Sequence, residues 1–200
     1  MNLKRLIDRV KAIQLGEATG HDWYHTCRVA GMSRQIGKME DCNMDIVLAA
    51  AYLHDVADHK FGYTKESRGA LLRELMTEAE FPSKLQEEVL EVVESISFSE
   101  GVPCCERLQK ESDVVKDADR LDALGAIGIA RTFAYGGKMG RPIYDPLDPA
   151  NSLQHFDDKL LLLADGMRTE AGKRLAQARH AVLVQFKEEF LKEWNAENIE

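Results

Sequence analysis

The chain has 200 residues, of which 44% are hydrophobic and 30% charged, and its formal net charge is −8 at pH 7. This length suits one globular domain or two, and the apolar fraction is too high for a disordered chain. The acidic balance argues against a fold-wide basic surface for nucleic acid. Charged residues interrupt the N-terminus at once, and no apolar run reaches the roughly 20 residues of a membrane span. We therefore expect a cytoplasmic protein with no nucleic-acid or membrane partner.

Apolar residues recur at helical spacing through the first half of the chain. The spacing predicts five helices, over residues 3–13, 29–39, 44–56, 71–79 and 83–96. The third of these is apolar on nearly all sides, which marks a buried central helix, and Asn43 is its expected N-cap.

The second half is also predicted to be helical. We expect a loop over 98–111, where Gly101-Val102-Pro103 breaks the pattern, then a helix over 114–133 and an irregular stretch over 136–149. Two further helices follow, one over 153–161 and one that begins near Thr169. No alternating β pattern, repeat or composition break occurs. The sequence thus predicts an all-α fold, a compact bundle of roughly seven to nine helices, as one domain over residues 1–200 with its C-terminal helices packed on the core.

Ionisable residues interrupt the apolar stripes of three predicted helices. The stripes extend, helix by helix, to His25, then to His54, Asp55 and Asp58, and then to Asp119 and Asp122. A buried carboxylate costs several kcal/mol unless it is paired or bound to a metal. Any single buried His is more often a hydrogen-bonded core residue, by about two to one. Three helices that each direct such groups inward favour a metal site instead, because imidazole nitrogens and carboxylate oxygens together suit a divalent cation.

The order of these residues resembles a known family. His25, then His54-Asp55, then Asp119 some 64 residues further on match the H…HD…D pattern of the HD-domain metal-dependent phosphohydrolases. The surrounding segments Gly20-His21-Asp22-Trp23-Tyr24-His25, Leu53-His54-Asp55-Val56-Ala57-Asp58 and Asp117-Ala118-Asp119-Arg120-Leu121-Asp122-Ala123-Leu124-Gly125 strengthen the resemblance. It covers most of the chain, and the Gly-Gly-Lys and Ser152-Leu153-Gln154-His155-Phe156 segments look like a small single-domain bacterial subgroup. Some members of that subgroup are nucleoside-triphosphate pyrophosphohydrolases.

The resemblance implies that His25, His54, Asp55 and Asp119 ligate one divalent metal ion. We choose Asp119 over Asp117 because it lies on the apolar stripe and a basic residue follows it, as in the family, and Asp122 is the alternative if the helix register is shifted. Two His and two Asp leave two open positions on an octahedral ion. Mn²⁺ is favoured, with Mg²⁺, Ni²⁺, Fe²⁺ and Co²⁺ as alternatives.

One metal ion is expected rather than two. Dinuclear members of the family need further His ligands between the HD doublet and the last Asp, and here His59 is the only histidine in that interval. The resemblance also assigns Asp58, three residues after Asp55, to the activation of water. An equally open interpretation is that Asp58 orients a ligand histidine.

A net acidic chain that binds a phosphorylated small molecule must gather positive charge locally. The candidate substrate-binding residues are His21, Arg28, Lys60, Arg120, Lys138 and Arg141. For Lys138 and Arg141, which we expect on a glycine-rich loop, ordinary solvated charges are an equally good interpretation. Cys104-Cys105 have neither the spacing of a zinc site nor a neighbouring His, so we do not expect a catalytic thiol there.

The expected activity is hydrolysis of a nucleoside or deoxynucleoside triphosphate to the monophosphate and pyrophosphate. Two alternatives remain at this point. One is a nucleotide phosphatase or phosphodiesterase of the same fold. The other is a non-catalytic helical module that binds a metal or a nucleotide.

Overall fold

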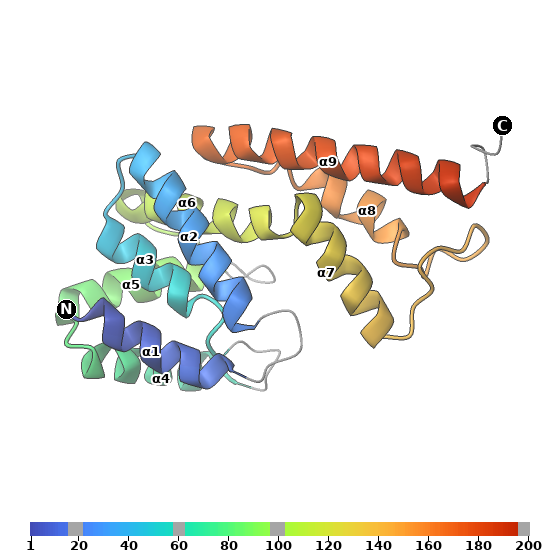
Figure 1. Ribbon diagram of the computed structural model, residues 1–200. Coiled ribbons are helices and arrows are strands. Elements are labelled where there is room, and N and C mark those ends of the chain that lie inside the picture. Colours follow the sequence, from blue (N-terminus) through green and yellow to red (C-terminus); the bar gives the residue numbers. More distant parts are fainter. Residues whose placement is uncertain (16–21, 58–62, 97–102, 196–200) are drawn as a thin grey trace. The chain divides into compact units, whose positions relative to one another are not determined.

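The computed structural model describes residues 1–15, 22–57, 63–96 and 103–195 (Figure 1). Within these ranges the chain forms nine α-helices and no strand, so the predicted all-α class is confirmed. The helices are α1 (Leu3–Gln14), α2 (Trp23–Met39), α3 (Met44–Leu53), α4 (Lys65–Glu78), α5 (Ser83–Ile96), α6 (Gln109–Asp122), α7 (Gly125–Lys138), α8 (Gln154–Asp158) and α9 (Glu170–Trp194). Among these described helices, none is both long enough and apolar enough to cross a membrane.

The chain divides into two compact units, Met1–Ala118 and Asp119–Glu200. The division falls inside α6, one continuous helix that begins in the first unit and ends in the second. The expectation of a single domain over residues 1–200 stays a prediction.

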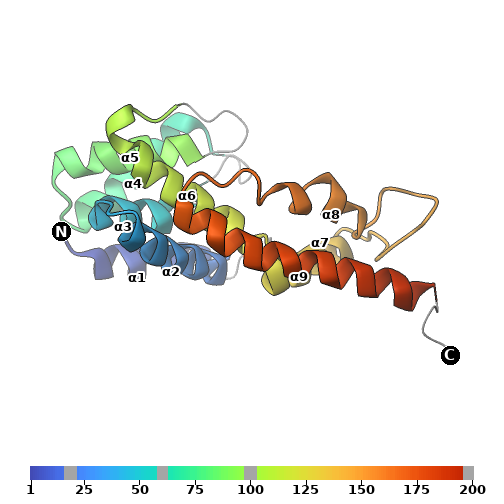
Figure 2. The ribbon, with the colours of Figure 1, turned by 90° about the horizontal axis from the view of Figure 1, so that it is seen from above.

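Helix α3 is the core of the first unit. Its residues from Ile46 to Ala51, and Leu53, are all buried, and α1, α2 and α5 pack against it (Figure 2). A helix that is apolar on every side is stable only when neighbours cover it all round, so the sequence of α3 dictates its central place. Asn43 is its N-cap as predicted, and the side chain of Asn43 accepts a hydrogen bond from the backbone N of Asp45 at 3.1 Å.

The end of α3 differs from the prediction. We expected the helix to continue to Val56, but it ends at Leu53 with His54 as its C-cap. The backbone N of Val56 bonds the carbonyl of Leu53 at 3.0 Å, which is a tighter turn than the α-helix makes. Ala57 then adopts a positive φ of 54°, which lies outside the right-handed helical region. The apolar pattern continues past this point and therefore could not signal the turn.

The predicted helix over 114–133 is wrong in its bounds. The structure forms a 3₁₀ helix η2 (Glu106–Leu108) and starts α6 at Gln109, inside the expected loop. It then ends α6 at Asp122 and starts a separate helix, α7, at Gly125. Gly125 has a φ of 68°, which is the left-handed conformation that favours glycine and stops a helix.

The glycine-rich loop predicted from Gly136 onward is also corrected, because Gly136, Gly137 and Lys138 are the last turn of α7. Gly136 is needed for close packing rather than for a turn. A Cβ at this position would lie 2.0 Å from the Oγ of Ser152. The irregular stretch begins only at Met139, so Lys138 is a helical residue.

The second unit is held together by aromatic side chains. α7 packs against α9, and Phe133 of α7 contacts the rings of Phe156, Phe186 and Phe190 at centroid separations of 5.8 to 6.2 Å. Rings at this spacing combine a large apolar area with favourable edge and offset contacts. Thr169 begins α9 as predicted, since its side chain caps the backbone N of Gly172 at 2.9 Å.

Candidate metal centre

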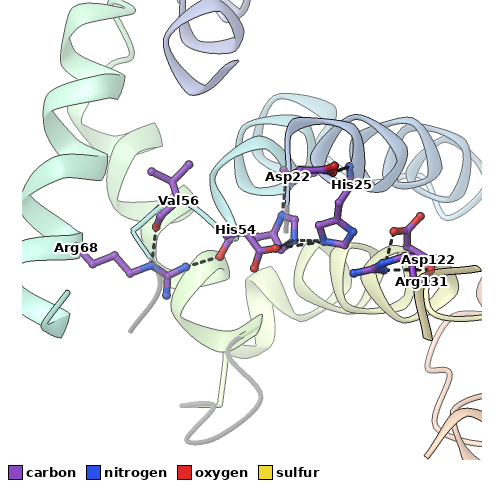
Figure 3. A network of polar contacts seen from close by, with 9 residues as sticks. Asp22, His25, His54, Val56, Arg68, Asp122 and Arg131 are labelled. Carbon is purple, nitrogen blue, oxygen red and sulfur yellow. Dashed lines mark hydrogen bonds and ion pairs between the residues drawn. The ribbon is translucent and has the colours of Figure 1, made fainter. Parts of the chain in front are cut away.

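His25 is fixed at the start of α2. Asp22 is the N-cap of this helix, and its carboxylate accepts a hydrogen bond from the backbone N of His25 at 2.8 Å (Figure 3). Such a cap satisfies a backbone donor that the helix itself leaves without a partner. The His25 side chain is fully buried, as the apolar stripe of the helix predicts.

His54 faces His25 from the end of α3. Its Nδ1 lies 2.7 Å from the carbonyl oxygen of Ala51. A carbonyl can only accept, so Nδ1 donates its proton and the Nε2 of a neutral ring carries the lone pair. That Nε2 lies 3.3 Å from the Nε2 of His25. The bond to Ala51 therefore aims the basic nitrogen of His54 at the other imidazole.

The carboxylate of Asp55 lies beside both imidazole rings. Its Oδ2 lies 3.2 Å from the Nε2 of His25 and 3.4 Å from the Nε2 of His54. The Asp55 side chain is only 11% exposed, and both imidazoles are more deeply buried. Two nitrogens and one carboxylate oxygen thus lie close together, although His25 on α2 precedes His54, in the turn after α3, by 29 residues.

Asp119 belongs to the same cluster. Ligand atoms of His25, His54 and Asp119 all lie within 4.8 Å of one another. Asp119 follows Ala118 without a break in α6, so the helix that begins in the first unit carries this carboxylate to its place.

Asp119 is less buried than the sequence predicts. We expected it to be the buried acid of its motif, yet Asp119 is half-buried, whereas Asp117 and Asp122 are 0% and 3% exposed. Asp122 is engaged elsewhere, since its carboxylate forms an ion pair with Arg131 at 2.8 Å (Figure 3). Proximity to the histidines, rather than depth of burial, distinguishes Asp119 from its neighbours.

Arg68 is a component that the sequence did not reveal. It projects from α4 toward the turn after α3, where its Nε donates to the carbonyl of Val56 at 3.2 Å and its Nη2 donates to the carbonyl of His54 (Figure 3). The planar guanidinium bridges these two carbonyls, and so it holds the turn that carries Asp55. Nothing in the local sequence could have identified it, because Arg68 is one of several charged residues on α4.

The other predicted site residues lie in different parts of the chain. Asp58, His21 and Lys60 lie outside the described residues. Arg28 lies half-buried on α2, one turn after His25.

The remaining three are in the second unit. Arg120 donates to the carbonyl of Gly166 at 2.5 Å, and Lys138 is exposed at the end of α7. The guanidinium of Arg141 lies over the ring of Tyr135, 5.7 Å from its centroid.

The donor set suits a divalent metal ion. Buried imidazole nitrogens and carboxylate oxygens that converge within hydrogen-bond distance match the preferences of first-row divalent ions, and the bond from His54 to Ala51 is the kind of second contact that orients a ligand histidine. The same atoms also contact one another directly, as a buried cluster of polar side chains.

Comparison with known proteins identifies the class. The model of the HD domain family matches residues 22–124, more than half of the chain and a span that includes His25, the His54-Asp55 doublet and Asp119. The chain belongs to the HD-domain phosphohydrolase family.

Relatives extend the similarity over nearly the whole chain. The uncharacterised protein YpgQ of Bacillus subtilis is 36% identical over 178 residues, which cover 88% of this chain and 86% of YpgQ. The crystal structure of YpgQ in complex with ADP has a TM-score of 0.82 at 31% identity, with 96% of this chain and 97% of that chain covered. An HD-superfamily hydrolase from Bacillus thuringiensis has the same TM-score at 42% identity and 97% coverage of both chains. The class defined by fold and family is therefore a hydrolase.

Replacement of Arg68 tests its role in holding the turn. Arg68→Gln removes two hydrogen bonds from a charged donor to backbone carbonyls, so we expect the free energy of unfolding to fall by about 1.5–3 kcal/mol. Arg73→Gln, on the same helix, breaks an exposed pair with Glu87 and should cost less than about 1 kcal/mol. Urea unfolding of both variants measures the difference. Equal losses would show that Arg68 contributes no more than a surface charge.

Proposed function

We propose that the protein is a cytoplasmic metal-dependent phosphohydrolase that cleaves a nucleotide phosphoanhydride, converting a nucleoside or deoxynucleoside triphosphate to the monophosphate and pyrophosphate. The observation that carries the proposal is the convergence of His25, His54 and Asp55, with Asp119 in the same cluster. The ADP complex of YpgQ supports a nucleotide as substrate, because ADP contains the phosphoanhydride group in question.

In this proposal His25, His54, Asp55 and Asp119 hold one divalent ion, with Mn²⁺ favoured over Mg²⁺, Ni²⁺, Fe²⁺ and Co²⁺. When bound, such an ion offsets charge on phosphoryl oxygens and lowers the pKa of a coordinated water. The chain's own part is to aim both imidazoles at one point, and the bond from His54 Nδ1 to Ala51 orients one of them. The Asp55 carboxylate supplies negative charge beside them, so the cluster attracts a cation.

Asp58 is proposed to accept the proton of the attacking water through a carboxylate oxygen. It follows Asp55 by three residues, which is close enough in the chain to act on the same substrate.

Positive charge for the substrate phosphates is proposed to come from His21, Arg28, Lys60, Arg120, Lys138 and Arg141. Of these, Arg28 has the firmest support, because it lies one turn from His25 on the same helix. A helix turn of 5.4 Å brings a phosphate group within reach of both residues.

The products of hydrolysis test the activity directly. We expect purified protein with Mn²⁺ to release pyrophosphate and monophosphate from members of a panel of ribo- and deoxyribonucleoside triphosphates, as followed by ³¹P NMR. p-Nitrophenyl phosphate and a cyclic dinucleotide are the controls for phosphatase and phosphodiesterase activity. Release of orthophosphate alone would support a phosphatase, and no turnover of any compound would support the non-catalytic module.

His54→Ala tests the metal assignment. Removal of one imidazole should strip the metal and abolish hydrolysis, while the far-ultraviolet circular dichroism stays largely helical, since His54 follows α3 rather than lying within it. Metal content is measured after dialysis against Mn²⁺. The matched control is His180→Ala, because His180 lies on α9 in the second unit and should leave the metal content unchanged. Full metal content and turnover in His54→Ala would reject the assignment.

Asp58→Ala separates the two interpretations of this residue. If Asp58 accepts the proton of water, the variant should keep its metal and lose roughly 10²–10⁴-fold in kcat. If Asp58 only orients a ligand histidine, metal affinity should fall by about 10–100-fold and saturating Mn²⁺ should restore much of the rate. Turnover measured across a Mn²⁺ titration distinguishes the two, and an unchanged rate at all concentrations would remove Asp58 from the mechanism.

A further inference from the structure

A second group of metal-binding side chains lies in the first unit, apart from the histidines. Ligand atoms of Glu91, Cys104 and Cys105 all lie within 4.8 Å of one another. Glu91 is on α5, and the two cysteines directly precede the 3₁₀ helix η2 that leads into α6. This cluster shares no residue with the HD motif.

The carboxylate of Glu91 is held against both cysteines. Its Oε1 accepts a hydrogen bond from the backbone N of Cys105 at 2.8 Å, and the Sγ of Cys104 donates to the same oxygen at 3.9 Å. These hydrogen bonds, chiefly those from Cys105, hold the pKa of Glu91 below its usual value. The group is therefore a fixed anion at neutral pH, and it faces two sulfur atoms.

Both cysteines are free thiols in the structure. Cys104 is buried and Cys105 is exposed, so one side of the cluster is dry and the other is open to water. Burial raises the pKa of Cys104 to about 11, which means that its thiol holds a proton when no metal is bound. Lys116 lies near Cys104 and Arg107 lies near Glu91, and Arg107 is already paired with Glu88 at 2.6 Å.

Two sulfurs and one carboxylate oxygen are the ligand types of a soft or borderline ion. Thiolates favour Zn²⁺ and its congeners over Mg²⁺ or Mn²⁺, and Zn²⁺ accepts three protein ligands with water in the fourth tetrahedral position. We propose that Glu91, Cys104 and Cys105 form a second metal site that binds a thiophilic divalent cation, Zn²⁺ in the cell, with the exposed side near Cys105 open to water. Binding exchanges the two thiol protons for the cation and ties the segment before η2 to α5.

No sequence pattern indicates this site, and the reason is physical. Adjacent cysteines do not have the C-x-x-C spacing of a zinc motif, and the third ligand lies 13 residues before Cys104 on a different element, helix α5. Only the packing of the segment before η2 against α5 places the carboxylate beside the sulfurs.

Titration with Cd²⁺ under a non-thiol reductant tests the proposal. Cadmium bound to thiolate absorbs in the ultraviolet through sulfur-to-metal charge transfer, whereas cadmium bound to imidazole and carboxylate does not. The signal therefore reports this site independently of the histidine cluster and of hydrolysis. We expect one equivalent of Cd²⁺ per chain to saturate the band, and Zn²⁺ to displace it.

Variants assign the ligands. Cys105→Ser changes an exposed residue, and Glu91→Gln keeps an oxygen that can accept from the backbone N of Cys105, so both should fold. Each substitution should weaken Cd²⁺ binding by at least about tenfold, because loss of a residue that merely orients a ligand already lowers metal affinity by about that factor. Cys42→Ser is the matched control, because Cys42 is a half-buried free thiol outside the cluster, and it should bind as the unaltered chain does.

Three results would overturn the proposal. The first is no charge-transfer band at a several-fold excess of Cd²⁺. The second is a band of unchanged affinity in Cys105→Ser. The third is unchanged affinity in Glu91→Gln, because the carboxylate would then not be a ligand.

Discussion

The candidate centre depends on two buried imidazoles whose Nε2 atoms lie 3.3 Å apart beside one carboxylate oxygen. Two histidines so close together and so well removed from water cannot both carry a proton at low cost, because like charges repel strongly where water does not screen them. The arrangement therefore disfavours two charged rings, and the bond from His54 Nδ1 to the Ala51 carbonyl assigns the tautomer of a neutral His54 that leaves a lone pair on Nε2. A cation at that point would satisfy the nitrogens and the carboxylate together.

The fold positions these side chains through the ends of helices. His25 sits in the first turn of α2 under the Asp22 cap, and His54 is the residue at which α3 stops. A helix end can direct a side chain along the helix axis, where the interior of a helix can only present a face. Arg68 completes the arrangement, because it binds the carbonyls of His54 and Val56 in the turn that follows α3.

The two proposed sites differ in chemical hardness. The histidine and aspartate cluster offers nitrogen and oxygen, as a phosphohydrolase centre requires, whereas Glu91 with Cys104 and Cys105 offers mainly sulfur. Ions sort between such sites by ligand type rather than by affinity alone, so one chain can hold a hydrolytic metal and a thiophilic one without competition. Similarity to YpgQ and to the Bacillus thuringiensis hydrolase extends over almost the entire chain, and it places the first site in a family of hydrolases.

The helical class, the burial of His25 and His54, the N-cap Asn43 and the start of the last helix near Thr169 follow from the sequence alone. Each is a local consequence of apolar spacing or of a side chain that bonds its own backbone. The sequence did not predict the end of α3 at Leu53 or the break between α6 and α7, because apolar residues continue across both positions. It also did not predict that Gly136 is helical, because this glycine is required by close packing against Ser152, which lies in another segment. The half-burial of Asp119 and the contacts of Arg68 and Glu91 show the same limit. One amino-acid sequence determines which residues a helix buries, but the distance between side chains on different helices depends on how those helices pack, and only the tertiary structure decided it.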